Sequence, residues 1–80
     1  MPDADYESYM IEGGSPMANA TFMSLDIQKK TGTHVVAVRR GSMVIQGIGH
    51  DFIFQEGDII LLIGDRPSLE NAYNLFFKKG

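Results

Sequence analysis

The longest uninterrupted apolar run in this 80-residue sequence is residues 59–63, which are all isoleucine or leucine. Gly57 and Asp58 precede the run with a tight-turn signature, and Gly64 follows it. A short apolar run between turn residues predicts a buried β-strand, and it falls far short of the roughly 20 residues that span a membrane. The chain is therefore expected to build its core around this strand.

Shorter patterns on either side predict further strands and helices. Apolar spacings of three and four residues are typical of helices, and alternating or β-branched runs are typical of strands. The expected elements are a strand at 6–12, a helix at 19–31, a strand at 35–38 covered on both faces, a return strand at 43–48, the strand at 59–63 and a helix that begins near Pro67. Their order predicts an α+β fold, in which a small, mostly antiparallel β-sheet packs with two short helices.

The last helix has more apolar residues than one sheet can cover. Its apolar face consists of Leu69, Ala72, Tyr73 and Phe76. Leu75 and Phe77 project elsewhere, and a chain this short buries only about 60 to 65% of the surface that its unfolded form exposes. We therefore expect Leu75 and Phe77 to be covered by a second subunit.

Composition and charge argue against several classes of function. The absence of cysteine excludes disulfides, thiolate zinc sites and thiol catalysis. The formal net charge is −3 and the basic residues are scattered, so no basic stripe is available for a nucleic-acid backbone. His50 and Asp51 lack a third converging metal ligand and are expected in a solvated loop. We therefore expect that the chain is not an enzyme, has no metal site and has no nucleic-acid partner.

Residues 1–5 differ from the rest of the chain because they are small or acidic and have little to bury. We expect them to form a disordered start or the remnant of a linker. Residues 6–80 are expected to form one domain.

Two further expectations concern side-chain placement. The five methionines are expected to fill gaps in the core, because the thioether chain adapts to irregular spaces. Arg39 and Arg40 are adjacent on a predicted strand, so they are expected on opposite faces. At most one of them can then line a shared site.

Taken in order, these motifs resemble the RCK C-terminal domain, also called the TrkA-C domain, of bacterial and archaeal potassium channels and cation transporters. The resemblance runs from Tyr9 to Phe77. The matching residues are Ser15, Pro16, Met17, Thr21, Phe22, Leu25, Asp26, Ile27, Gly32, residues 35–38, Arg40, Phe52, Phe54, Gln55, Gly57, Asp58, residues 59–63 and Gly64. The chain departs from the family at Asn19 and Ala20, where many relatives have Gly and Lys, and in the loop 47–50, where prolines are usual.

The resemblance implies a function as well as a fold. It implies a cytoplasmic regulatory domain of a potassium channel or a cation:proton antiporter, held at the inner face of the membrane by that partner. Such a domain forms a homodimer, senses a small ligand at the dimer interface and gates monovalent cation transport. A purely structural dimerisation module without a ligand is the alternative.

Some members of this family bind cyclic di-AMP at the dimer interface, and their motif can be compared position by position. Phe22 and Met23 stand at the aliphatic pair, Asp26 matches, and Val35 and Val36 match the later aliphatics. Gln28 stands where Arg is expected, and His34 stands where Asn is expected. The resemblance therefore makes these residues the candidate ligand contacts and cyclic di-AMP a candidate ligand.

Other interpretations of these residues stay open at this point. Gln28 has no charge for a phosphate, so another small ligand or a divalent cation is also a candidate. His34 also fits a strand-end imidazole satisfied by backbone or water. Asp26 also fits a helix cap or an ion pair with a neighbouring turn.

Overall fold

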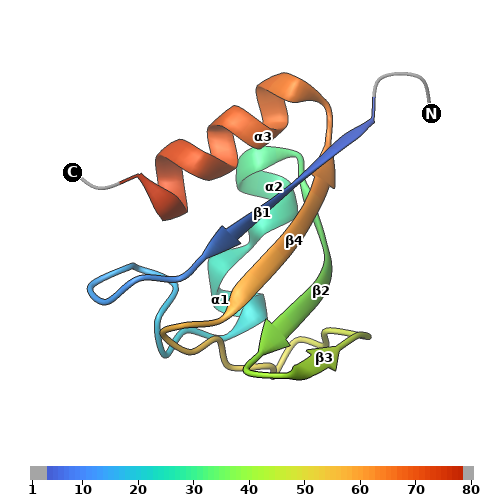
Figure 1. The fold of residues 1–80 in the computed structure, drawn as a ribbon. Helices are drawn as coiled ribbons and strands as arrows, with labels where there is room; N and C mark the ends of the chain where they lie inside the picture. Colours follow the sequence, from blue (N-terminus) through green and yellow to red (C-terminus); the bar gives the residue numbers. More distant parts are fainter. Residues whose placement is uncertain (1–3, 79–80) are drawn as a thin grey trace.

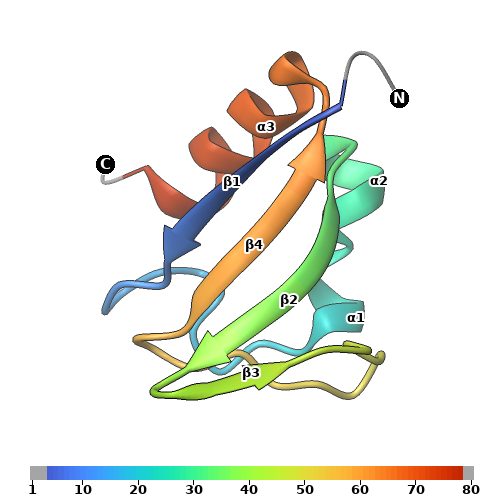
Figure 2. The same cartoon turned by 45° about the vertical axis from the view of Figure 1, so that its right-hand side comes forward.

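The computed structural model describes residues 4–78 and has the α+β architecture that the sequence predicts. The elements are β1 (Asp5–Met10), α1 (Phe22–Leu25), α2 (Ile27–Thr31), β2 (His34–Arg40), β3 (Met43–Ile45), β4 (Ile59–Gly64), α3 (Arg66–Ala72) and the π-helical turn η1 (Tyr73–Phe77). The strands form one antiparallel sheet in the order β1-β4-β2-β3, and the helices cover one of its faces (Figure 1, Figure 2).

β4 is the predicted central strand. It pairs along its whole length with β1, from Asp5 opposite Gly64 to Met10 opposite Ile59. On its other side it pairs with β2, which carries a bulge between Val35 and Ala37. Because side chains alternate along a strand, Ile60 and Leu62 face the helices and are fully buried. The intervening residues of β4 lie on the open face of the sheet.

β1 and β2 differ in two respects from the expectations. Asp5 belongs to β1, which corrects its expected place in a disordered start, and residues 1–3 lie outside the described residues. The expected covering of residues 35–38 on both faces is wrong within one chain, because Val36 at the bulge is 42% exposed. Val38 is buried among the core residues.

The single helix expected over 19–31 is also wrong, because the chain breaks it at Asp26. Asp26 adopts the left-handed conformation with φ +48°, so α1 ends there and α2 begins after it. Thr21 caps α1 by accepting a hydrogen bond from the Ser24 amide at 3.1 Å. Gly32, with φ +87°, ends α2; glycine adopts this conformation readily because it has no Cβ, and a Cβ here would clash with Ser68.

The last helix follows the sequence pattern only in part. Asp65 caps α3 through the Ser68 amide at 2.8 Å, and Leu69 and Ala72 are buried as expected. η1 then widens the helix, so Phe76 is buried whereas Tyr73, expected on the same face, is 43% exposed. Phe77 stacks on Tyr9 within its own chain, with ring centroids 4.7 Å apart. Of the two residues expected at a subunit contact, Leu75 is the one that stays exposed.

Most methionines lie on the surface and not in the core. Met17 is fully buried, but Met10, Met23 and Met43 are more than half exposed. Met1 lies outside the described residues. The return strand is also shorter than expected, because β3 ends at Ile45 shortly before Gly47 takes a positive φ of +65°. Within residues 4–78, no helix combines the length and the apolar character needed to cross a membrane.

Candidate functional site

A shallow pocket of about 230 Å³ lies where α1, α2 and the loop before Phe52 meet. Its lining residues are Phe22, Met23, Asp26, Ile27, Gln28 and His50. The structure therefore brings together the predicted ligand residues Phe22, Met23, Asp26 and Gln28. Their role in binding stays a prediction.

The break at Asp26 shapes one wall of this pocket. Leu25 and Ile27, on either side of Asp26, are both buried in the core. Side chains two positions apart point in nearly opposite directions on a regular helix, so the left-handed residue lets both of them face the core. Asp26 makes no side-chain capping hydrogen bond to α2, so the helix-cap interpretation is wrong. Its exposed carboxylate lines the pocket instead.

Phe22 forms the apolar side of the pocket and is held by an aromatic cluster beneath it. Its ring meets the fully buried ring of Phe54 edge-on, with centroids 6.4 Å apart. Phe52 contacts Phe54 in the same manner at 5.1 Å. Met23 lies beside Phe22 but is 67% exposed. The pocket therefore has one fixed aromatic wall and one apolar side chain available to a ligand or partner.

Segment 50–54 completes the pocket because it runs alongside the chain that leads into α1. The Phe22 amide donates to the Phe52 carbonyl at 2.8 Å, and the Met23 amide donates to the His50 carbonyl at 3.1 Å. The Phe54 amide donates in the opposite direction, to Ala20. These bonds bring His50 to the pocket, where the sequence predicted only a solvated loop. The alternation of Phe52 and Phe54 was the signal of an extended segment that needs a partner.

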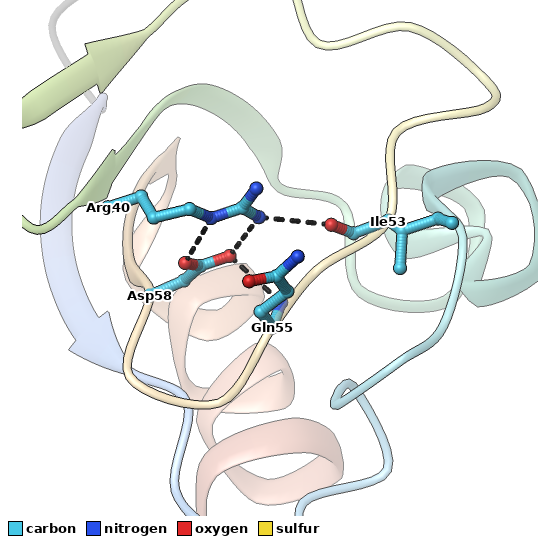
Figure 3. A network of polar contacts seen from close by, with 4 residues as sticks. All are labelled: Arg40, Ile53, Gln55 and Asp58. Atoms are coloured by element: carbon cyan, nitrogen blue, oxygen red, sulfur yellow. Dashed lines mark hydrogen bonds and ion pairs between the residues drawn. The ribbon is translucent and has the colours of Figure 1, made fainter.

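An ion pair between the half-buried Arg40 and the buried Asp58 anchors the other end of this segment (Figure 3). The Arg40 guanidinium donates from Nε and Nη2 to the two oxygens of Asp58, at 2.9 and 2.8 Å. Arg40 Nη2 also donates to the Ile53 carbonyl at 3.0 Å, and the Gln55 amide donates to Asp58 at 2.9 Å. The guanidinium lies 5.2 Å from the centroid of the Phe52 ring. Arg40 therefore ties β2 to both the pocket loop and the start of β4.

The environment of Asp58 keeps it charged. Burial by itself raises the pKa of Asp58, but the hydrogen bonds from Arg40 and from the Gln55 amide outweigh it and hold the pKa below its ordinary value. The same hydrogen bond to Asp58 raises the pKa of Arg40. Both residues belong to the family pattern, but 18 positions separate them, so no local sequence pattern pairs them.

The remaining predicted contacts, His34, Val35 and Val36, lie on β2 and do not line this pocket. Val35 packs against the core of its own chain. His34 and Val36 are exposed. One chain therefore presents the predicted site as two separate groups of residues.

Two larger hollows lie between the end of β1 and η1. They measure about 300 and 470 Å³ and share Met10, Glu12, Phe77 and Lys78 among their lining residues. None of the predicted ligand residues lines either of them. Within residues 4–78, no group of three or more His, Asp or Glu side chains gathers closely enough to hold a metal ion.

Comparison with known families and proteins gives one consistent match. A family model described as the TrkA-C domain matches residues 7–76. "Probable potassium channel protein 2" of Methanocaldococcus jannaschii is 29% identical over 77 residues, which are 96% of this chain and 22% of that protein. The chain thus spans less than a quarter of the length of this curated relative.

Solved structures with the same fold include domains bound to a nucleotide. The RCK_C domain dimer of S. agalactiae BusR in complex with c-di-AMP has a TM-score of 0.81 and 18% identity, over 91% of this chain and 90% of that one. The RCK C domain of the potassium transport protein KtrA, also in complex with c-di-AMP, has a TM-score of 0.77 and 23% identity, over 86% and 79%.

A longer BusR structure is also similar. S. agalactiae BusR in complex with its busAB-promotor DNA has a TM-score of 0.80 and 20% identity, over 94% of this chain and 36% of that one. The absence of a nucleic-acid partner therefore stays a prediction for this chain, based on its charge. At these identities the structural likeness establishes the fold.

Proposed function

Because the chain belongs to the TrkA-C domain family, also called RCK_C, we propose that it is the ligand-sensing regulatory domain of a potassium channel or a cation:proton antiporter. Two copies form a symmetric homodimer on the cytoplasmic side of the membrane, at the transport partner. A small ligand at the shared surface favours one arrangement of the subunits, and this population shift gates monovalent cation transport. The pocket beside α1, which is lined by four of the seven predicted ligand residues, is the observation that carries the proposal.

The free edge of β2 supports a homodimer. β3 pairs with β2 only at Val38, Arg39 and Arg40, so no strand in the described part of the chain covers the outer edge of the first half of β2. Such an edge presents backbone groups that another chain can pair. Exposed Val36 adds apolar surface to this half-strand. In the homodimer, the predicted ligand contacts that do not line the pocket of one chain lie at the shared interface. These residues are His34, Val35 and Val36.

Cyclic di-AMP is the candidate ligand with the most support. The BusR and KtrA domains that share this fold are both in complex with c-di-AMP. In this chain the apolar wall and Asp26 are in place, whereas Gln28 offers a neutral amide. An amide lacks the charged, planar fork with which Arg engages a phosphate. Binding is therefore expected to be weaker than in a relative that keeps the Arg.

Calorimetric titration of the 80-residue chain with c-di-AMP, and separately with ATP, tests this proposal. We expect saturable heat with c-di-AMP and one ligand bound per dimer. Gln28→Arg should bind about tenfold more tightly, because it restores a charge-assisted bond to phosphate. The matched control is Lys30→Arg, a change on the exposed side of α2 that does not line the pocket. Flat heats at high micromolar protein for wild type and Gln28→Arg would overturn the nucleotide proposal.

A purely structural dimerisation module is the second candidate. The neutral Gln28 in the pocket favours it, because an amide lacks the charge with which Arg engages a phosphate. A ligand that binds only the folded chain raises its melting temperature. If c-di-AMP, ATP and divalent cations all leave the melting temperature unchanged while the chain sediments as a dimer, the structural module is the correct function.

A further inference from the structure

His50 is the lining residue of the pocket that can carry a positive charge. The other lining residues are apolar, amide or carboxylate side chains. A doubly negative phosphodiester ligand needs donors, and charge-assisted donors are roughly twice as strong as neutral ones. Gln28 supplies only a neutral donor. The imidazole of His50 is therefore the group in this pocket that can compensate for the missing Arg.

The backbone holds His50 at the pocket. Its carbonyl accepts the Met23 amide of α1 at 3.1 Å, and the Phe52 amide closes a turn around it by donating to the Gly49 carbonyl at 3.1 Å. The residue is exposed, so its imidazole can turn toward a ligand. These hydrogen bonds hold the backbone of His50 against α1.

The other charged groups near His50 are carboxylates, cations outside the pocket lining, or a guanidinium that is already paired. Asp26, at the corner between α1 and α2, is the other titratable group that lines the pocket, and Asp51 follows His50 in the loop. Lys29 and Lys30 on α2 are exposed and do not line the pocket. Arg40, whose guanidinium lies over Phe52, is committed to Asp58.

We infer that His50 is the phosphate-contacting residue of this pocket and that the domain binds anionic nucleotides more tightly as the pH falls. This inference rests on the proposed ligand-sensing function. An imidazole gains its proton as the pH falls through the range from about 8 to about 5, and the protonated ring has two donors and a positive charge. The domain then reports nucleotide level and acidity together.

Calorimetric titration with c-di-AMP at about pH 5.5 and about pH 8 tests the inference. We expect wild type to bind about tenfold more tightly at the lower pH, which is the effect of about 1.4 kcal/mol of added interaction. His50→Gln keeps a neutral donor and should bind weakly at both pH values. His50→Lys keeps a positive charge at both and should bind with little pH dependence. Gln46→Ala, in the same loop but outside the pocket lining, is the control and should behave as wild type.

The outcomes separate this inference from the proposed function. If wild type binds c-di-AMP equally well at both pH values, or if His50→Gln retains the pH dependence, His50 is not the phosphate contact and the inference fails alone. In the second case His34, which lies outside the pocket on β2, is the other histidine to examine. If wild type binds at neither pH, the nucleotide proposal fails together with the inference. Melting curves of all variants establish that they are folded.

Discussion

Arg39 and Arg40 are adjacent in β2 but make different contacts. Arg40 is held in the network around Asp58, whereas Arg39 is exposed and donates to the nearby Gly41 carbonyl at 3.2 Å. The opposite placement follows from the alternation of side chains along a strand, as the sequence predicted. The partner of Arg40 could not be predicted in the same way, because it depends on how segment 52–58 folds back over β2.

Arg40→Leu is expected to destabilise the domain by about 3 kcal/mol, because it leaves the Asp58 carboxylate, which is 1% exposed, without its counter-charge. Urea unfolding measures this difference. Arg39→Leu is the matched control and should change stability by less than about 0.5 kcal/mol, because Arg39 lies on the surface. Equal losses in the two variants would show that the Asp58 contact does not stabilise the fold.

Segment 50–54 and α1 form one structural element in space, although 27 positions separate Met23 from His50 in the sequence. Two amides of α1 donate to this segment, and the residues just before α1 extend the pairing, with Phe54 donating to the Ala20 carbonyl and a bridge between Thr21 and Ile53. This element carries the pocket. The edge of β2 is a second, separate element that the proposed dimer uses.

Val36→Lys is expected to weaken the homodimer by about tenfold or more, because a lysine on a free strand edge opposes pairing with another strand. Sedimentation equilibrium measures the dissociation constant. Val44→Lys is the matched control, since Val44 is also an exposed valine but lies on β3, away from the free half of β2. An unchanged dissociation constant for Val36→Lys would place the dimer interface elsewhere.

The strands were easier to predict than the pocket, and the reason is physical. The run at 59–63 needs burial on a sheet whatever surrounds it, so β4 follows from local sequence alone. The break at Asp26 follows from the need to bury both Leu25 and Ile27, which a continuous helix cannot do on one face. The spacing of these two residues was a signal for the break. The position of His50 at the pocket depends on backbone pairing between segment 50–54 and the start of α1. No local sequence pattern encodes this long-range pairing.

At the scale of the whole molecule, carboxylates with lowered pKa values make stability depend on pH. Their hydrogen bonds lower the pKa values of Asp65, through Ser68, and of Asp5, through the Tyr6 amide and Arg66. In Asp58 the bonds from Arg40 and Gln55 outweigh the opposing effect of burial. A carboxylate whose pKa is lower in the folded state than in the unfolded state stabilises the fold when the pH is above the unfolded-state pKa. This stabilisation is lost as the pH falls toward the folded-state pKa.

The melting temperature is therefore expected to fall as the pH is lowered from about 5 to about 2, since an unfolded Asp titrates near about 3.9. Calorimetric melting curves across this range measure the slope. Asp58→Asn, whose side chain cannot titrate, should have a lower melting temperature than wild type at the upper end of this range. Its melting temperature should fall less as the pH is lowered. If wild type and Asp58→Asn decline in parallel, the buried pair does not contribute to acid sensitivity.

The attachment of α1 to segment 50–54 has a mechanical consequence. The backbone of α1 is hydrogen-bonded to this segment, and the segment in turn is hydrogen-bonded through the Ile53 carbonyl to Arg40. Met23 at the surface is therefore connected through this segment to the Arg40 guanidinium, which is paired with Asp58 just before β4. Segment 50–54 thus connects α1 on one side to β2 of the sheet on the other.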